Sequence, residues 1–148
     1  MNLDDAKEIT VLFQSVMELL HEKIFTRPRQ ECTSQPLLKK NQLKILMILS
    51  RHDHITLTEI GKSLNIEKGS LTTLVDGLVE NNLVIRSNDL NDRRKSIIFL
   101  SPSGKEMADK VLKFYSYKID ELLRDVDSGE YEQFRNSLQF VVQFLNKV

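Results

Sequence analysis

Apolar residues recur every three or four positions over residues 4–25, which is the spacing of one face of an amphipathic helix. The stripe consists of Ile9, Phe13, Val16, Met17, Leu20 and Ile24. Further apolar residues beside the stripe make this surface larger than one small partner would cover. The helix is expected to end before Pro28, because the residue that precedes a proline is pushed out of the helical region. Residues 28–38 then form a connecting loop.

The middle of the chain predicts a helix-turn-helix. A helix is expected over residues 40–51, and its apolar positions point toward a core. The segment Thr56-Leu57-Thr58-Glu59 matches a capping box, so a short helix begins there. Asn65 and Ile66 turn the chain into a further helix over residues 68–80, which has exposed Ser and Thr positions. A short capped helix, a tight turn and a second helix are typical of this motif.

A β-hairpin follows the second helix. Asn81-Asn82 is expected to stop that helix, because asparagine tolerates the left-handed conformation. Residues 83–86 and 96–100 are short apolar runs that contain β-branched residues, and they predict two antiparallel strands. Residues 88–95 between them are polar apart from Leu90 and form a longer loop than a two-residue turn.

Two more amphipathic helices complete the pattern, over residues 102–126 and 130–146. Ser101-Pro102 starts the first of them, with an N-cap serine and a proline in the first helical position. Their apolar stripes, together with that of the first helix, exceed what the middle of the chain could cover. A two-fold dimer would bury them, and an intramolecular bundle is the competing interpretation.

Composition places the chain among ordinary globular proteins, with 148 residues, 41% hydrophobic and 28% charged. No stretch approaches the roughly 20 apolar residues that a membrane span requires, and acidic residues follow Met1 where a secretory signal would be positive. A single cysteine, Cys32, cannot form an internal disulfide, so we expect a cytoplasmic protein. The net charge is zero, but residues 38–95 carry +3, between flanks of −2 and −1. A basic middle segment favours contact with phosphate.

Several motifs agree, in order, with those of the MarR family of transcriptional regulators, which this chain resembles over about residues 40–105. They are Gln42-x-x-Ile45-Leu46-x-x-Leu49, then Leu71-Thr72-x-Leu74-Val75-Asp76-x-Leu78-x-x-x-x-Leu83-Val84-x-Arg86, then Asp89-Leu90-Asn91-Asp92-Arg93-Arg94 and Ile97-x-Phe99-Leu100-Ser101-x-x-Gly104. Two departures stand out. Asn82 replaces the glycine usual at the end of the recognition helix, and Thr73 and Gly77 stand where many members place arginine or another large polar residue.

The resemblance implies a mainly α fold with a small β-hairpin wing: a winged helix-turn-helix with long N- and C-terminal dimerisation helices. On this basis residues 1–37 are the N-terminal dimerisation helix and loop, 38–101 the DNA-binding domain, and 102–148 the C-terminal dimerisation helices. The family further implies a homodimer that binds a palindromic operator on double-stranded DNA. It also implies repression that is relieved by a small phenolic or other aromatic ligand.

The second helix of the helix-turn-helix offers contacts to the major groove. Short hydroxyl side chains can bond phosphates or base edges, and a helix N-terminus attracts phosphate. The candidates at that end of the helix are Lys68, Ser70, Thr72 and Thr73. The same residues would also serve as an ordinary helix start.

The hairpin is the sharper signal, because Arg93, Arg94 and Lys95 are consecutive cations between two strands. An arginine on a thin ribbon can enter the narrow minor groove, where negative potential is concentrated. By resemblance Arg94 is the inserted residue, and Asp92 orients the arginines through a charge-assisted hydrogen bond. The alternative is a solvated charged turn.

Other interpretations stay open. The family analogy places an effector pocket beside Phe13, Met17, Met47 or Phe114, which are equally explained as core. A redox-responsive regulator would use Cys32, although no tyrosine precedes Tyr115, and a metal-responsive one would use His21, His52 or His54. A winged-helix protein-interaction module without DNA binding is a further alternative. We find no phosphate-binding glycine loop, paired-histidine motif or nucleophile elbow, so we expect no enzyme, cofactor or metal.

Overall fold

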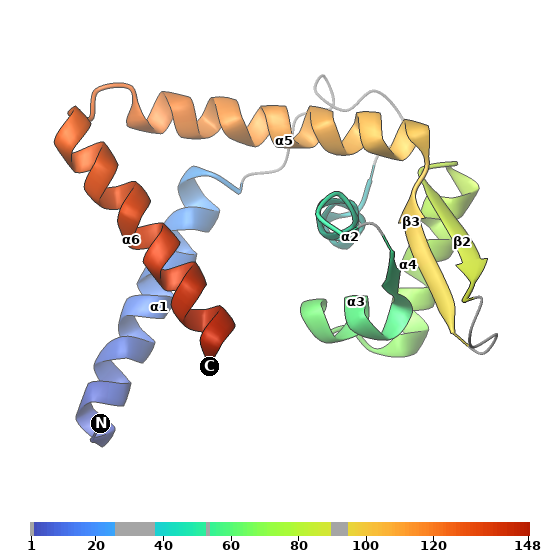
Figure 1. Cartoon of the computed structure of the whole chain (residues 1–148), viewed down its shortest axis with the longest axis horizontal. Coiled ribbons are helices and arrows are strands. Elements are labelled where there is room, and N and C mark those ends of the chain that lie inside the picture. Colours follow the sequence, from blue (N-terminus) through green and yellow to red (C-terminus); the bar gives the residue numbers. More distant parts are fainter. Residues whose placement is uncertain (1, 26–37, 53, 90–94) are drawn as a thin grey trace. The chain divides into compact units, whose positions relative to one another are not determined.

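The computed structural model describes residues 2–25, 38–52, 54–89 and 95–148. The chain divides into two compact units, one made of residues 1–25 and 116–148 and the other of residues 26–115. The second unit holds three short helices and a small sheet (Figure 1). Each unit is described by itself below.

Three helices form the helix-turn-helix region of the 26–115 unit. They are α2 (Lys40–Leu49), α3 (Leu57–Leu64) and α4 (Lys68–Glu80). The capping box forms as expected, because the Thr56 side chain accepts from the Glu59 N–H and the Glu59 carboxylate accepts from the Thr56 N–H at 2.8 Å. Asn65 ends α3 in the left-handed conformation, with φ 50°, and this turns the chain toward α4.

The sheet has three antiparallel strands in the order β1-β3-β2. They are β1 (Ile55–Thr56), β2 (Val84–Asn88) and β3 (Ser96–Leu100). The predicted hairpin is present, although its first strand extends two residues farther than expected, to Asn88. The edge strand β1 was not predicted, since two residues between a turn and a helix start show no alternation. It exists because Ile55 lies opposite Ile98 in the register with β3.

One hydrophobic core holds the helices and strands of this unit together. Its fully buried side chains come from α2, α3, α4, β3 and the first part of α5 (Pro102–Leu123). They are Ile45, Leu46, Ile60, Leu71, Val75, Leu78, Ile98 and Val111. Burial of each such side chain contributes roughly 1.5–3 kcal/mol, so this core accounts for much of the unit's stability.

The other unit contains α1 (Leu3–Lys23), the end of α5, and α6 (Ser128–Lys147). Both whole helices have side-chain N-caps, from Asn2 on α1 and from Asp127 on α6. The cap at Asp127 explains why α6 begins two residues before the predicted start. Neither α1 nor α6 contains a buried residue, although both are amphipathic.

The fold therefore confirms the predicted class, which is mainly helical with a small hairpin and long terminal helices. The predicted domain boundaries at residues 37 and 101 remain predictions. Among the described residues, no helix is long and apolar enough to cross a membrane.

We expect Thr56→Ala to lower the free energy of unfolding by about 1 kcal/mol, because the side-chain cap of α3 is lost. Urea denaturation measures the change. Thr58→Ala is the matched control, since Thr58 is exposed inside the same helix and does not cap it. An equal loss in both variants would contradict a capping role for Thr56.

The same cap predicts a pH dependence. Hydrogen bonds from the Thr56 side chain, and then from its backbone, lower the pKa of Glu59 below its ordinary value of 4.5. The ionised carboxylate therefore stabilises the fold above that ordinary pKa, and the contribution is lost as pH falls through the lowered one. The difference in stability between the native chain and Thr56→Ala should accordingly shrink in acid.

Candidate nucleic-acid interface

The first turns of α4 carry the four residues predicted to meet DNA from a helix. Lys68, Ser70 and Thr73 are exposed and Thr72 is half-buried, so all four lie at or near the surface. In the described part of the chain, the Glu67 side chain makes no capping hydrogen bond to α4. The N–H groups in the first turn of α4 are therefore not occupied by the N-cap side chain, and such groups bind phosphate readily.

The two threonine hydroxyls of α4 already donate hydrogen bonds. Thr72 Oγ1 donates to the carbonyl of Lys68 at 2.9 Å, and Thr73 Oγ1 donates to the carbonyl of Gly69 at 3.3 Å. A hydroxyl has one proton and two lone pairs, so these side chains keep only their acceptor capacity and their methyl groups. They suit a base amino group or a thymine methyl better than a phosphate oxygen, which needs a donor.

An ion pair joins the hairpin to α4. Arg86 on β2 lies 3.1 Å from the Asp76 carboxylate on α4, and both side chains are partly exposed. The contact neutralises an acid on the helix that would otherwise repel phosphate, and it links helix and wing. Sequence reasoning did not assign either residue to the site. The only available signal was that both belong to the family-like motif, 10 residues apart.

The hairpin ladder continues to the pair Asn88 and Ser96. Beyond it, the Asp89 N–H donates to the Lys95 carbonyl at 2.9 Å, which closes the ribbon. Lys95 is exposed, as a phosphate contact requires. Asp92, Arg93 and Arg94 lie outside the described residues, and their roles stay predictions.

The base of the wing is held by a set of backbone contacts around Ser101. Its hydroxyl donates to the Asn82 carbonyl at 2.5 Å and accepts from the Gly104 N–H at 2.9 Å. Its own N–H donates to the Leu83 carbonyl at 3.1 Å. Asn82 adopts a φ of 57°, as predicted for the end of α4. The start of α5 is thereby attached to the start of β2.

Gly104 allows this attachment, because a Cβ at that position would overlap the Leu83 carbonyl. We expect Gly104→Ala to destabilise the fold by about 1–3 kcal/mol, since backbone would have to move. Gly69→Ala is the control: nothing lies within 4 Å of the added carbon, and alanine favours a helix by up to about 1 kcal/mol. Urea denaturation of both variants tests the contact, and a Gly104→Ala protein as stable as the native chain would refute it.

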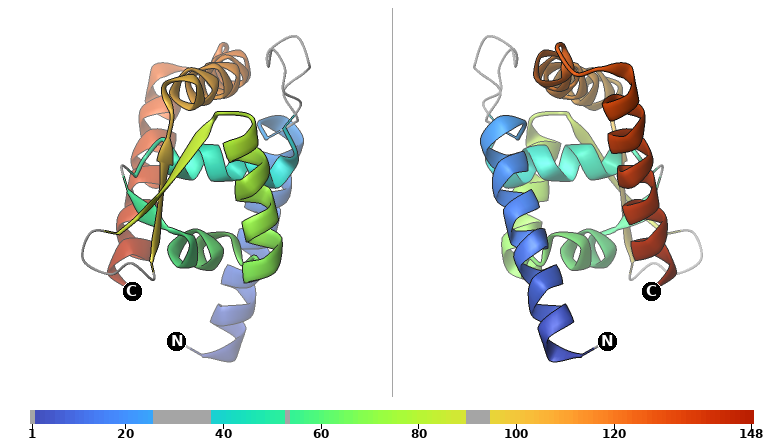
Figure 2. Two further views of the ribbon diagram at one scale, coloured as in Figure 1. Left: turned by 90° about the vertical axis from the view of Figure 1, so that its right-hand side faces the viewer. Right: turned by 90° about the vertical axis from the view of Figure 1, so that its left-hand side faces the viewer.

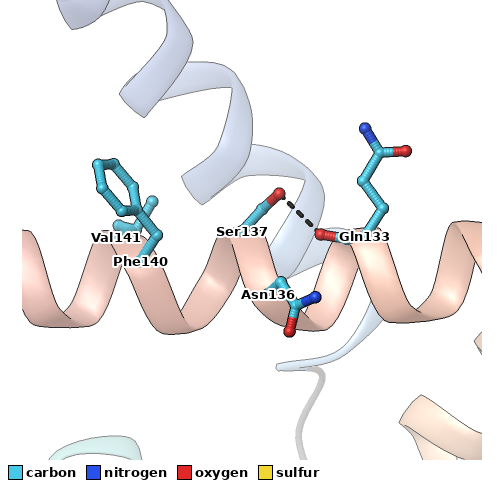
Figure 3. A pocket seen from close by; sticks show the side chains of 5 residues that line it. All are labelled: Gln133, Asn136, Ser137, Phe140 and Val141. Atoms are coloured by element: carbon cyan, nitrogen blue, oxygen red, sulfur yellow. Dashed lines mark hydrogen bonds between the residues drawn. The ribbon is translucent and has the colours of Figure 1, made fainter.

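The four predicted effector residues fall in different units. Phe13 and Met17 are 48% and 66% exposed on α1, whereas Met47 and Phe114 are half-buried in the 26–115 unit. Their joint pocket stays a prediction. A hollow of about 630 Å³ lies elsewhere, on α6, and is lined by Gln133, Asn136, Ser137, Phe140 and Val141 (Figure 3). Its lining comes from one helix alone, which is not the enclosed form of a small-molecule site.

The candidate sensing residues gain no support. Cys32 lies outside the described residues. His21, His52 and His54 are exposed, and the His54 ring lies 5.2 Å from that of Phe99. Within the described ranges, no three His, Cys, Asp or Glu side chains are grouped so that they could hold a metal.

A helix-turn-helix followed by a two-stranded wing defines a winged-helix protein. Residues 38–96 match the model of the MarR family. The HTH-type transcriptional repressor YetL of Bacillus subtilis is 32% identical over 99 residues, which are 66% of this chain and 59% of that protein. An uncharacterized HTH-type transcriptional regulator of Staphylococcus aureus, SAV2265, is 33% identical over 50% of this chain and 54% of its own length. The chain thus spans little more than half the length of these curated relatives.

Solved structures resemble nearly the whole chain. A MarR transcriptional regulator from Methanosarcina mazei Go1 covers 99% of each chain with 25% identity and a TM-score of 0.64. The regulator BldR from Sulfolobus solfataricus covers 100% of each with 20% identity and a TM-score of 0.67, which shows the fold alone. Residues 38–96 thus match the MarR family model, and nearly the whole chain shares the fold of solved MarR-family regulators.

Proposed function

We propose that this chain is a sequence-specific DNA-binding transcriptional regulator that acts as a homodimer on a palindromic operator. The observation that carries the proposal is the exposed, hydroxyl-bearing start of α4, joined by the Arg86–Asp76 ion pair to a wing that ends in basic residues. Helix and wing suit the two grooves of a duplex. The printed names of the curated relatives, an HTH-type repressor and HTH-type regulators, support the same class.

The exposed apolar surface of α1 and α6 supports a homodimer. Large apolar side chains on these helices remain exposed in the single chain, and burial of each would contribute roughly 1.5–3 kcal/mol. They include Val11, Leu12, Phe13, Val16, Met17, Phe134, Leu138, Val141, Val142 and Leu145. A two-fold arrangement would cover them, and a palindromic duplex would require two α4 helices about 34–36 Å apart, which is one turn of DNA.

The dimer is tested by the solution mass of the full chain. Light scattering at micromolar concentration should give about twice the 17.2 kDa of one chain. Leu138→Asp should shift the mass toward the monomer, because it places an unpaired charge in the proposed interface, where Leu138 is 45% exposed in the single chain. Gln139→Asp, a charge at a neighbouring polar position, is the control. A monomeric native chain would disprove the dimer.

The DNA-binding proposal is tested by selecting duplexes from a random pool with the full chain. We expect a palindromic product whose affinity falls steeply with salt, because phosphate neutralisation releases counterions. Arg94→Ala should lower the affinity for that duplex by about tenfold to a hundredfold without unfolding the protein. Arg124→Ala removes an exposed arginine from the other unit and should leave binding unchanged.

Failure to enrich any duplex at low salt would instead favour a winged-helix protein-interaction module. Unchanged affinity in Arg94→Ala would remove Arg94 from the interface while leaving the helix contacts in place.

We further propose that the regulator is a repressor whose DNA is released by a small phenolic or other aromatic ligand. Repeating the selected-duplex titration with added phenols tests this, and unchanged affinity across such compounds would argue against it.

A further inference from the structure

Gln42 is a buried polar side chain of α2, a helix that contacts α4. The two helices lie side by side in Figure 2. It is 8% exposed, and both ends of its carboxamide are used. Its Oε1 accepts from the Lys39 N–H at 3.0 Å, and its Nε2 donates to the Leu74 carbonyl at 3.2 Å. The first bond fixes which way the amide points, because only the oxygen can accept. The NH₂ group is therefore directed at α4.

Gly77 leaves space for this amide, because it has no side chain. A Cβ at residue 77 would lie 2.9 Å from Gln42 Nε2, closer than unbonded atoms allow. Residues 70, 73 and 77 follow helical spacing along one stripe of α4, so Gly77 continues the stripe of Ser70 and Thr73. The Gln42 amide thus contacts α4 beside the surface that the proposed function turns toward DNA.

Apolar side chains of α2 and α4 also share the core of this unit. Leu46 on α2 and Val75 and Leu78 on α4 belong to the common core. Apolar packing is non-directional. A core that keeps its total volume loses its unique arrangement before it loses stability. A hydrogen-bonded amide has a required distance and direction, so it restricts how far α4 can slide or rotate against α2.

We infer that Gln42 is a positioning residue for α4. Its hydrogen bond to the Leu74 carbonyl and its fit in the space beside Gly77 set where α4 lies when it contacts bases. The inference rests on the proposed DNA binding. It also gives Gly77 a role, because the absence of a side chain there leaves room for the amide. The role predicts an effect on sequence discrimination, which depends on base contacts, and little effect on non-specific phosphate binding.

The test measures affinity for the duplex selected by the native chain and for a scrambled duplex of equal length. Gln42→Leu, which keeps the volume but neither hydrogen bond, should lower the ratio of the two affinities by about tenfold, the scale of one lost base contact. Gly77→Ala should lower the ratio as well. Its fold should hold, because the atom displaced is the end of a flexible side chain and alanine favours the helix.

A double variant separates this mechanism from a direct clash between DNA and the methyl group that Gly77→Ala adds. In Gln42→Ala, where the amide is absent, adding Gly77→Ala should cause no further loss of discrimination. A further loss equal to that seen in the native background would overturn the role of Gln42 at this position. Ile45→Val is the control for stability alone, since it removes one buried methylene from α2 and leaves Gln42 intact. Its discrimination ratio should match that of the native chain.

Thermal unfolding of each variant shows which fraction is folded at the assay temperature. If both duplexes lose affinity in parallel with that fraction, Gln42 is merely structural and the inference fails. If Gln42→Leu and Gly77→Ala keep the native ratio, it fails as well. A native chain that prefers no duplex would instead defeat the proposed function, and that outcome is visible before any variant is made.

Discussion

A close backbone contact at the base of the wing holds the 26–115 unit in its arrangement. Gly104 lies against the Leu83 carbonyl. Ser101 makes hydrogen bonds to the backbone of Asn82, Leu83 and Gly104. The contact ties the start of α5 to the start of β2, and β2 carries Arg86, which pairs with α4. The helix α4, the strand β2 and the start of α5 are thereby linked to one another. The placement of the hairpin against α4 therefore depends on that junction.

The terminal helices obey a different constraint. Every residue of α6 is exposed in the single chain, including aromatic and branched side chains. Amphipathic helices of 21 and 20 residues that bury nothing would be costly in water. Their stability is therefore coupled to whatever covers them, and under the proposed function a second copy does so. The hollow on α6 fits this interpretation, because it is a bare helix face and not an enclosed cavity.

Most elements could be predicted from the sequence, because their signals are local. The capping box at Thr56, the left-handed Asn82 and the Ser101 cap each depend on residues within one helical turn, and all three form as expected. The strand β1 could not be predicted, since its two residues have no pattern and depend on pairing with β3. Gln42 shows the same limit: it lies among other polar residues and gives no sign that its amide will meet a carbonyl 32 positions away.

The sequence by itself determined the order and type of the elements other than β1, the helix-turn-helix and the surface residues at the start of α4. These follow from hydrophobic period and capping chemistry, which act over a few residues. Only the tertiary structure decided that Arg86 meets Asp76, that Gly104 touches Leu83 and that Gly77 makes room for Gln42. Each of these contacts joins separate elements whose positions are set by a shared core. A core is close-packed, so the position of one element depends on all its neighbours at once.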